Sequence, residues 1–388
     1  MKTPVGLVGC GTISDVYVEN ARRFANYEIV ACADLLGDRA RAKAAQHGIP
    51  RVVELEALYS DPRIEVILNL TNPQSHVAVD LAALEGGKHV YSEKPFATSL
   101  AEGRRVRELA ASKGLIMGCA PDTFLGGRLQ TFRALLEEGA IGEPVAGFAA
   151  MVCHGHESWH PGPEFYYKAG AGPLFDMGPY YLTALVSLLG PVRRVSGSAR
   201  TSFPVRTIGR GPLKGQTIEV EVPTHVSGSI EFVRGTLVTL VTSFDVWDSM
   251  LPRFEIWGTG GTLALLDSDP LAGPNVFGGM IHLRRAEEGD WNGFPTALPR
   301  KERPTPWRPI SPRFPYNEDA RGVGLADMVA AISSARRPRA EASMGFHVLE
   351  IIEGLLESAR SGAAYSLKST CERPMPLPAG VREWCFES

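Results

Sequence analysis

The chain has 388 residues, 44% of them hydrophobic, and a formal net charge of −3 at pH 7. This length suggests two domains with hydrophobic cores, and the interspersed charges offer no basic face for nucleic acid or a membrane surface. Six cysteines without metal-ligand spacing, no charged leader and no apolar run of spanning length lead us to expect a cytoplasmic protein with reduced thiols and a small-molecule partner.

The first segment predicts a dinucleotide-binding turn. A short apolar strand over residues 4–8 leads to Gly9 and Gly11, and a helix is expected from about residue 13 to residue 24. A glycine turn that opens a helix binds pyrophosphate through backbone N–H groups and the helix dipole. Ser14 replaces the third glycine of the fingerprint, and its small side chain should still fit. The cofactor-contact candidates in this turn are Gly9, Gly11, Thr12 and Ile13.

Asp34 follows the second expected strand, residues 28–33. An acid at this place hydrogen-bonds the adenosine ribose hydroxyl, and the two leucines behind it offer no cation for a 2′-phosphate. The sequence therefore favours NAD over NADP as the cofactor. Two alternatives remain: Arg39 leaves NADP possible, and Asp34 could simply cap the next helix.

Further strands over residues 66–70, 89–91 and 115–119 alternate with helix-length segments. This alternation predicts a doubly wound parallel sheet, so we expect an α/β Rossmann domain over residues 1–121. Residues after the strand at 66–70 emerge at the carboxyl edge of the sheet, where ligands bind. A plain turn with a capping serine is the alternative. The cofactor-contact candidates in this loop are Thr71, Asn72 and His76.

The pattern changes after residue 121, and residues 122–388 predict an α+β domain for substrate binding and oligomerisation. A helix near 127–138 precedes an antiparallel sheet. Residues 285–316 are rich in proline and predict a long surface loop or arm. Two helices, about 322–334 and 344–360, close the chain. The expected strands cover residues 145–152, 192–200, 225–233, 236–244, 253–258 and 262–266.

Two motifs carry candidate chemistry. Lys94 ends a strand-like stretch beyond the dinucleotide turn, where a lysine can meet the reactive end of a cofactor. Asp176 and Tyr180 are spaced one helical turn apart, so both can project from one helix face toward one substrate. The alternative is structural: Asp176 caps the helix over 177–189 and Tyr180 is packing.

The chain resembles the Gfo/Idh/MocA family of oxidoreductases over essentially its whole length. Three features carry the resemblance: the glycine turn, the Glu-Lys-Pro motif at residues 93–95, and the run from Gly170 to Tyr180. The resemblance implies a Rossmann domain, a C-terminal domain with a large open, mainly antiparallel sheet, and NAD(P)-dependent hydride transfer at a secondary alcohol or ketone of a sugar, polyol or inositol. It implies Lys94 and Asp176 as catalytic residues, with Glu93 and Lys94 at the cofactor. Tyr180 takes the acid–base position, where many members have histidine. We also expect a homo-oligomer, a dimer or tetramer.

The chemistry of these residues agrees with those roles. Oxidising a secondary alcohol needs a proton acceptor at the hydroxyl and a hydride acceptor nearby. A phenol normally titrates near about 10, so Tyr180 would need the Lys94 ammonium to favour the phenolate, unless the lysine polarises the alcohol directly. The resemblance also implies a cis Lys94–Pro95 bond.

The run from His156 to His160 matches the H-E-x-x-H pattern of zinc proteases. Proline follows at once and pushes the preceding residue out of helical geometry, so we expect no metal here. A better interpretation makes residues 153–167 a substrate loop with aromatic faces and polar groups for a polyhydroxyl ligand; an exposed loop pinned by its aromatics is the alternative. The substrate-contact candidates are Asp122, Trp159, His160 and Tyr166.

Three functions therefore remain open: a sugar or polyol dehydrogenase, a nucleotide-binding regulator without turnover, and a zinc hydrolase. The joint presence of Lys94, Asp176 and Tyr180 favours the dehydrogenase, because a regulator needs none of them.

Overall fold

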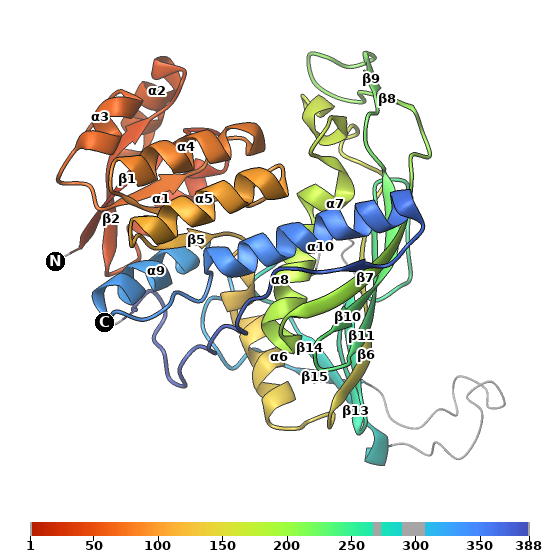
Figure 1. Ribbon diagram of the computed structural model, residues 1–388. Coiled ribbons are helices and arrows are strands. Elements are labelled where there is room, and N and C mark those ends of the chain that lie inside the picture. The colour runs from red at the N-terminus through yellow and green to blue at the C-terminus, as the bar shows by residue number, and fades with distance from the viewer. Residues whose placement is uncertain (1, 267–272, 289–306, 387–388) are drawn as a thin grey trace. The chain divides into compact units, whose positions relative to one another are not determined.

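The computed structural model describes residues 2–266, 273–288 and 307–386, which form two compact units (Figure 1). Each unit is built on its own sheet. Unit 1 comprises Met1–Leu125, Glu318–Glu353 and Ser369–Ser388, and unit 2 comprises Gly126–Asn317 and Gly354–Lys368.

Unit 1 contains a five-stranded sheet in the order β2-β1-β3-β4-β5, with every neighbouring pair parallel. Its strands are apolar runs because helices cover both faces of such a sheet: Val5, Val66 and Leu68 are fully buried. The predicted doubly wound sheet is confirmed. The strands are β1 (Thr3–Val8), β2 (Tyr27–Ala33), β3 (Val66–Asn69), β4 (His89–Ser92) and β5 (Met117–Cys119).

The helices of unit 1 connect these strands and pack on them. α1 and α2 contact β2, α4 contacts β3 and β4, and α9 contacts β5. They are α1 (Ser14–Ala21), α2 (Gly37–His47), α3 (Leu55–Ser60), α4 (Pro73–Glu85), α5 (Leu100–Ser112) and α9 (Val323–Ser333), with the short η1 at Thr123–Leu125. α10 (Ala342–Ser361) begins in unit 1 and ends in unit 2.

The compact units differ from the sequence-based division at residue 121. α9 was expected in the C-terminal domain, but it packs on β5, and the Cys119 N–H of that strand bonds the Ala340 carbonyl at 2.9 Å. Asp122 adds a second link, because its carboxylate accepts the N–H groups of Gly322 and Gly324 at 2.9 and 3.0 Å. These contacts join segments about 200 residues apart in sequence, a separation that periodicity alone does not reveal.

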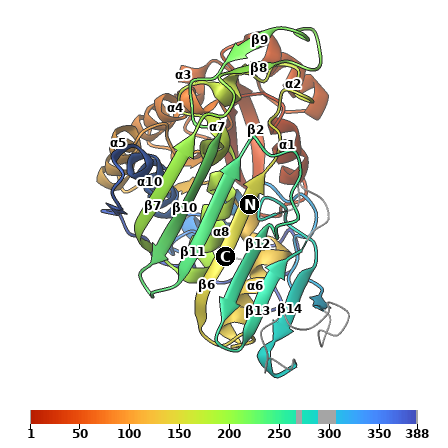
Figure 2. The same cartoon turned by 90° about the vertical axis from the view of Figure 1, so that its right-hand side faces the viewer.

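Unit 2 contains a nine-stranded sheet in the order β15-β14-β13-β12-β6-β11-β10-β7-β16. Only β6 and β11 pair in parallel within it, so the expected mainly antiparallel sheet is confirmed (Figure 2). The strands are β6 (Pro144–Val152), β7 (Val192–Arg200), β10 (His225–Phe232), β11 (Leu237–Ser243), β12 (Phe254–Gly258), β13 (Gly261–Leu265), β14 (Ile281–Arg285), β15 (Arg308–Ile310) and β16 (Tyr365–Ser366).

One face of this sheet is covered within the unit by helices that Figure 2 shows behind the strands. α8 packs on β6 and on α6, and every one of its residues is buried. These helices are α6 (Gly127–Glu137), α7 (Gly172–Asp176) and α8 (Gly178–Leu189), with η2 at Glu164–Tyr167. A separate hairpin joins β8 (Val205–Thr207) and β9 (Thr217–Glu219), which the sequence did not predict.

The expected helix face shared by Asp176 and Tyr180 is wrong. Asp176 is the last residue of α7, Met177 interrupts the helix, and Tyr180 lies in the first turn of α8. Pro179 explains the break, since its ring provides no N–H to continue α7 but suits the start of a new helix. The alternative in which Asp176 caps α8 is also wrong, because the capping position is Met177.

Part of the predicted proline-rich loop at 285–316 is regular. Its start lies in β14 and the short helix η3 (Ala286–Glu288), and its end contains β15, which pairs with β14. Residues 289–306 lie outside the described residues.

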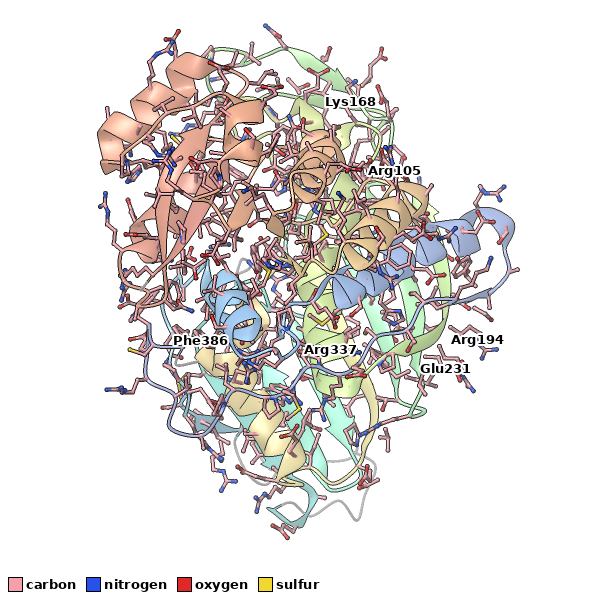
Figure 3. All side chains as sticks on the ribbon, turned by 60° about the vertical axis from the view of Figure 1, so that its left-hand side comes forward. Arg105, Lys168, Arg194, Glu231, Arg337 and Phe386 are labelled. Carbon is pink, nitrogen blue, oxygen red and sulfur yellow. The ribbon has the colours of Figure 1, made fainter. Side chains whose placement is uncertain are left out.

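Ion pairs join the side chains of β7 and β10 in the sheet of unit 2. Glu231 on β10 accepts hydrogen bonds from Arg193 and contacts Arg194 at 2.8 Å, both on the neighbouring strand β7 (Figure 3). The Arg193 guanidinium holds the pKa of Glu231 below its usual value.

No helix within the described ranges is both long and apolar enough to cross a bilayer.

Candidate active site

The glycine turn of unit 1 is built as the sequence predicted. Gly9 has a φ of +93°, and a Cβ at this position would lie 2.7 Å from backbone atoms of Leu70 and Thr71, so only glycine fits. A Cβ on Gly11 would meet nothing within 4 Å, so this side of the turn is open. Ser14 is fully buried and its Oγ donates to the Gly11 carbonyl at 2.6 Å, which shows how serine replaces the third glycine.

Asp34 is held against this turn. Its Oδ2 accepts the Cys10 N–H at 2.8 Å, and its Oδ1 accepts the Leu36 N–H at 2.9 Å. Each carboxylate oxygen keeps a second lone pair that can accept a ribose hydroxyl. Leu35 behind it is 90% exposed. The open glycine turn at the start of α1 and the fixed acid beside it therefore fit a dinucleotide, with Thr12 and Ile13 exposed at the same helix start.

The loop after β3 is fixed by its own side chains. Asn72 caps α4 by accepting the Ser75 N–H at 3.1 Å, and the Thr71 hydroxyl donates to Asn69 at 2.7 Å. His76 is fully buried, with Nε2 2.9 Å from the Thr71 carbonyl and Nδ1 2.9 Å from the Pro95 carbonyl. Burial lowers the pKa of His76, and a neutral imidazole donates to one carbonyl at a time. His76 therefore links this loop to the Glu-Lys-Pro motif, and its contact with a cofactor stays a prediction.

The Glu-Lys-Pro motif follows β4. Glu93 is buried; its Oε1 accepts the Tyr17 hydroxyl at 2.8 Å and its Oε2 accepts the Lys94 N–H at 2.9 Å. The Lys94–Pro95 bond is cis, as expected. Lys94 itself is partly exposed, so its ammonium can reach a ligand while its backbone is held in place.

Asp122 has a structural environment. It is 1% exposed, and its Oδ2 accepts the two N–H groups at the start of α9. Burial raises its pKa to about 6. These bonds give Asp122 a structural role, and its contact with a substrate stays a prediction.

In unit 2, Asp176 and Tyr180 lie on consecutive helices. The Asp176 side chain is 17% exposed, and its Oδ2 lies 3.1 Å from Nε2 of His156. Tyr180 is 8% exposed and Tyr181 only 2%. The pairing of His156 with Asp176 escaped the sequence reasoning, because the two residues are 20 positions apart and belong to different motifs.

The predicted substrate loop at 153–167 has an ordered interior and an exposed rim. The Tyr166 ring lies 4.2 Å from the His156 ring, so Tyr166 approaches the Asp176 neighbourhood. Trp159 is 52% exposed at the rim, with its ring 5.3 Å from that of His156. The Nδ1 of His160 accepts the Gly162 N–H at 3.1 Å. Their substrate contacts stay predictions.

The H-E-x-x-H run does not form a regular helix; its residues adopt turns. The Glu157 carboxylate is occupied by the Tyr167 hydroxyl and by Nη1 of Arg206 at 2.8 Å. No group of three histidine, cysteine or acidic residues is arranged for a metal in the part of the chain that the structure describes. Glu157 therefore has a structural partner here, which the sequence did not reveal because Arg206 lies 49 positions away.

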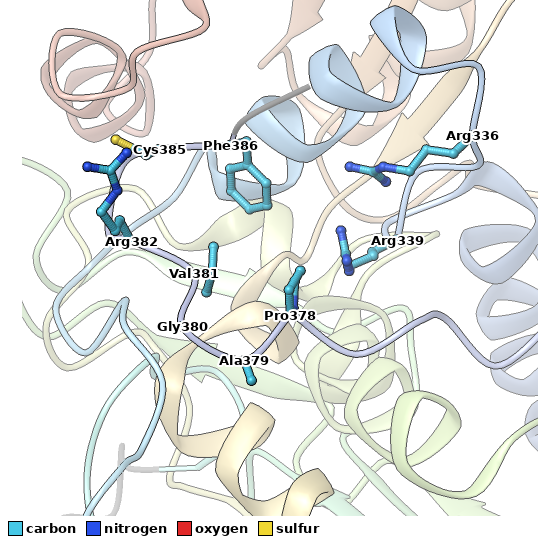
Figure 4. A pocket seen from close by; sticks show the side chains of 9 residues that line it. All are labelled: Arg336, Arg339, Pro378, Ala379, Gly380, Val381, Arg382, Cys385 and Phe386. Atoms are coloured by element: carbon cyan, nitrogen blue, oxygen red, sulfur yellow. The ribbon is translucent and has the colours of Figure 1, made fainter.

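A cavity of about 330 Å³ lies within unit 1, apart from the predicted site residues (Figure 4). Its lining consists of Arg336, Arg339, residues 378–382, Cys385 and Phe386. Arg339 pairs with the buried Asp327 at 2.5 Å and donates to the Pro376 carbonyl at 2.9 Å. These bonds attach the C-terminal segment to α9, which explains the arginine without a ligand.

Comparison with known proteins relates both units to one group of enzymes. Residues 3–120 match the GFO_IDH_MocA model, described as "Oxidoreductase family, NAD-binding Rossmann fold", and residues 129–264 match the GFO/IDH/MocA C-terminal domain. Lys94 lies in the first range, and Asp176 and Tyr180 lie in the second.

Individual relatives and solved structures match different shares of the chain. A 1,5-anhydro-D-fructose reductase from Ensifer adhaerens is 28% identical over 290 residues, which cover 73% of this chain and 80% of the relative. A trans-1,2-dihydrobenzene-1,2-diol dehydrogenase from Bos taurus is 30% identical over 48% of this chain and 55% of its own length. A structure of levoglucosan dehydrogenase with NADH and levoglucosan superposes with a TM-score of 0.77 at 19% identity, covering 95% of this chain and 99% of the other, which shows a shared fold.

Proposed function

Because this chain belongs to the Gfo/Idh/MocA family of oxidoreductases, we propose that it transfers a hydride between NAD and a secondary alcohol or ketone of a sugar, polyol or inositol. The two family models together match more than half of the 388 residues, and this joint match carries the proposal. A glycine turn alone would support only dinucleotide binding, whereas the second domain contributes the candidate acid and base.

Residues of unit 1 would hold the cofactor. The turn at Gly9 and Gly11 offers backbone N–H groups to the pyrophosphate, and Asp34 accepts the adenosine ribose hydroxyls. The NAD preference follows from the Asp34 charge, which repels a 2′-phosphate. When bound, the nicotinamide ring supplies the hydride acceptor or donor.

Three side chains of the protein take the remaining roles. Tyr180 accepts the proton of the reacting hydroxyl, which is the task of a general base in alcohol oxidation. Lys94 contributes a positive charge that stabilises a phenolate or a developing alkoxide. Asp176 accepts a hydrogen bond from a substrate hydroxyl or orients the acid–base residue Tyr180. This joint assignment rests on the motif pattern of the family.

The substrate class follows from the relatives and the loop chemistry. The names of the relatives include an anhydrofructose reductase and a dihydrobenzene-diol dehydrogenase, so ring-borne hydroxyl groups are the shared feature. The aromatic rings of Trp159 and Tyr166 suit the apolar face of such a ring, and His160 offers a polar contact.

Two further properties are part of the proposal. All six cysteines are free thiols, which suits the reducing cytoplasm. We also infer a homo-oligomer, a dimer or tetramer. Analytical ultracentrifugation at micromolar concentration tests this point, and a monomer would contradict it.

The experiment that tests the function is a substrate screen read at the nicotinamide absorbance band. Purified protein is incubated with NAD and a panel of aldoses, inositols and cyclic diols, and with NADH and keto-sugars. We expect an absorbance change with at least one compound, at a rate about a hundredfold lower or less in the Tyr180→Phe variant. Tight NADH binding without turnover on every compound would instead identify a nucleotide-binding regulator.

A further inference from the structure

His156 is placed against Asp176 by packing from several elements of unit 2. Its Nε2 lies 3.1 Å from Asp176 Oδ2, and the residue is 8% exposed. Ring centroids of Tyr166 and Phe244 lie 4.2 and 4.6 Å from its own. An imidazole enclosed in this way has few orientations available, so its direction toward Asp176 is fixed by the fold.

A backbone hydrogen bond and an ion pair of the next residue hold the segment that carries His156. The His156 N–H donates to the Tyr167 hydroxyl at 3.3 Å, and the next residue, Glu157, pairs with Arg206 at 2.8 Å. Arg206 also binds the Asp245 carboxylate, which accepts the Thr224 hydroxyl at 2.7 Å. The loop is therefore tied to the hairpin strand β8 and to the ends of β10 and β11.

The surroundings of the two ring nitrogens of His156 indicate which of them carries the proton. Nδ1 is buried and has no hydrogen-bond partner among the described residues. A neutral imidazole carries one N–H and one lone pair, and an ionised carboxylate only accepts hydrogen bonds, so the ring nitrogen that faces Asp176 must be the donor. The proton therefore belongs on Nε2, from which it is donated to Asp176.

We propose that His156 is a positioning residue, which fixes the Asp176 carboxylate in its working orientation through an Nε2–H donor. This inference rests on the proposed catalytic role of Asp176. The hydrogen bond from a rigid ring helps to hold the carboxylate in one orientation before substrate arrives. The relationship resembles that of an orienting group to a catalytic base, in which the orienting group acts only through its partner.

The test is a double-mutant cycle on turnover. His156→Phe keeps a flat ring and removes the donor, whereas His156→Gln keeps an amide N–H near the Nε2 position. Each is measured alone and with Asp176→Asn, on the substrate found by screening, as kcat, KM, NADH affinity and melting temperature. His282→Phe is the matched control. His282 is a partly buried histidine on β14, and the strands β13 and β12 separate β14 from β6 in the sheet.

We expect His156→Phe to lower kcat about tenfold or more with NADH affinity unchanged, and His156→Gln to restore most of it. In the Asp176→Asn background, His156→Phe should cost nothing further, because the residue acts through Asp176. Wild-type kcat in His156→Phe with a crippled Asp176→Asn would overturn this inference and leave the proposed function standing. Independent, multiplicative losses would also overturn it. Wild-type kcat in Asp176→Asn would remove the proposed role of Asp176 and this inference with it.

A spectroscopic measurement keeps the inference testable if His156→Phe does not fold. Nitrogen-15 spectra of histidine-labelled protein, assigned with His156→Gln, report which ring nitrogen carries the proton. We expect the Nε2–H form, with a shift of this signal in Asp176→Asn. A single proton on Nδ1, with Nε2 unprotonated, in the wild-type protein would overturn the proposal.

Discussion

The Tyr17 hydroxyl donates to Glu93 at 2.8 Å and so connects the first Rossmann helix to the lysine motif 76 positions later. The other oxygen of Glu93 accepts the Lys94 N–H at 2.9 Å. Helix α1, which starts at the glycine turn, and the backbone of Lys94 are thereby fixed to one carboxylate. Burial raises the pKa of Tyr17 well above its ordinary value, so the phenol stays a donor at neutral pH.

Replacing Lys94 with Ala should lower kcat/KM by a factor equivalent to about 2.7 to 4 kcal/mol, as for other single groups that stabilise a developing oxyanion. NAD affinity should change much less. Steady-state kinetics and NADH fluorescence titration measure the two effects. If affinity falls as far as turnover does, the lysine mainly holds the dinucleotide. Tyr17→Phe should cause a smaller loss of turnover, since it removes only the support of Glu93.

Replacing Asp34 with Ser should weaken NAD binding about tenfold, because it removes charged hydrogen bonds to the ribose, and should narrow or invert the preference over NADP. Competitive titration of the two cofactors measures this preference. Asp38→Ser is the control, since Asp38 is exposed and pairs with Arg41 on the same helix. An unchanged NAD affinity in Asp34→Ser would show that the acid does not reach the ribose.

Tyr180→Phe should lower turnover about a hundredfold or more, the usual contribution of general acid–base catalysis, with NAD binding intact. The neighbouring Tyr181→Phe is the control, because Tyr181 is 2% exposed in the core of the same helix. A crippled Tyr181→Phe beside an active Tyr180→Phe would shift the role by one residue. Full activity in both would direct attention to His154 or His160 as proton acceptors.

Replacing Arg206 with Met should destabilise the protein by about 3 to 5 kcal/mol, because two buried carboxylates, Glu157 and Asp245, lose their shared partner. Denaturant unfolding followed by tryptophan fluorescence measures the change. Arg194→Met on the exposed face of β7 should cost less than about 1 kcal/mol. Equal losses in the two variants would contradict the buried network as a source of stability.

Asp80 predicts a pH dependence of stability. Burial raises its pKa to about 7, so the folded protein binds a proton that the unfolded chain has released above its ordinary pKa near 3.8. Stability should therefore fall as pH rises from about 4 to about 7. Asp80→Asn removes this term, and its unfolding free energy should decline less over that window. Parallel pH profiles for the two proteins would show that Asp80 is ionised in the folded state.

Periodicity and turn chemistry predicted most of the fold. The parallel strands, the glycine turn and the six expected strands of the second sheet are local patterns, and the structure places them within a few residues of the expected bounds. The sequence did not predict β14, β15 and β16 of that sheet. The short hairpin β8–β9 was missed because three-residue strands leave too little alternation to detect.

The sequence predicted only those parts of the candidate site that belong to local motifs. Ser14 and Asp34 could be placed from their spacing, because the turn that positions them is local. The partners of Asp176, Glu157 and Asp122 come from segments 20 to about 200 residues away, and packing decides those contacts. Proline chemistry also mattered: Pro179 separates the helices of Asp176 and Tyr180, which spacing alone had placed on one face.

Transfer of deuterium tests the central claim most directly. NADH deuterated at the transferring carbon of the nicotinamide ring is incubated with the keto form of the substrate, and the product is examined by mass spectrometry and NMR. The account predicts one deuterium on the carbon that bears the new hydroxyl, and a rate of transfer about a hundredfold lower or less with Tyr180→Phe. Product formed without deuterium, or no reduction of any keto-sugar despite bound NADH, would contradict it.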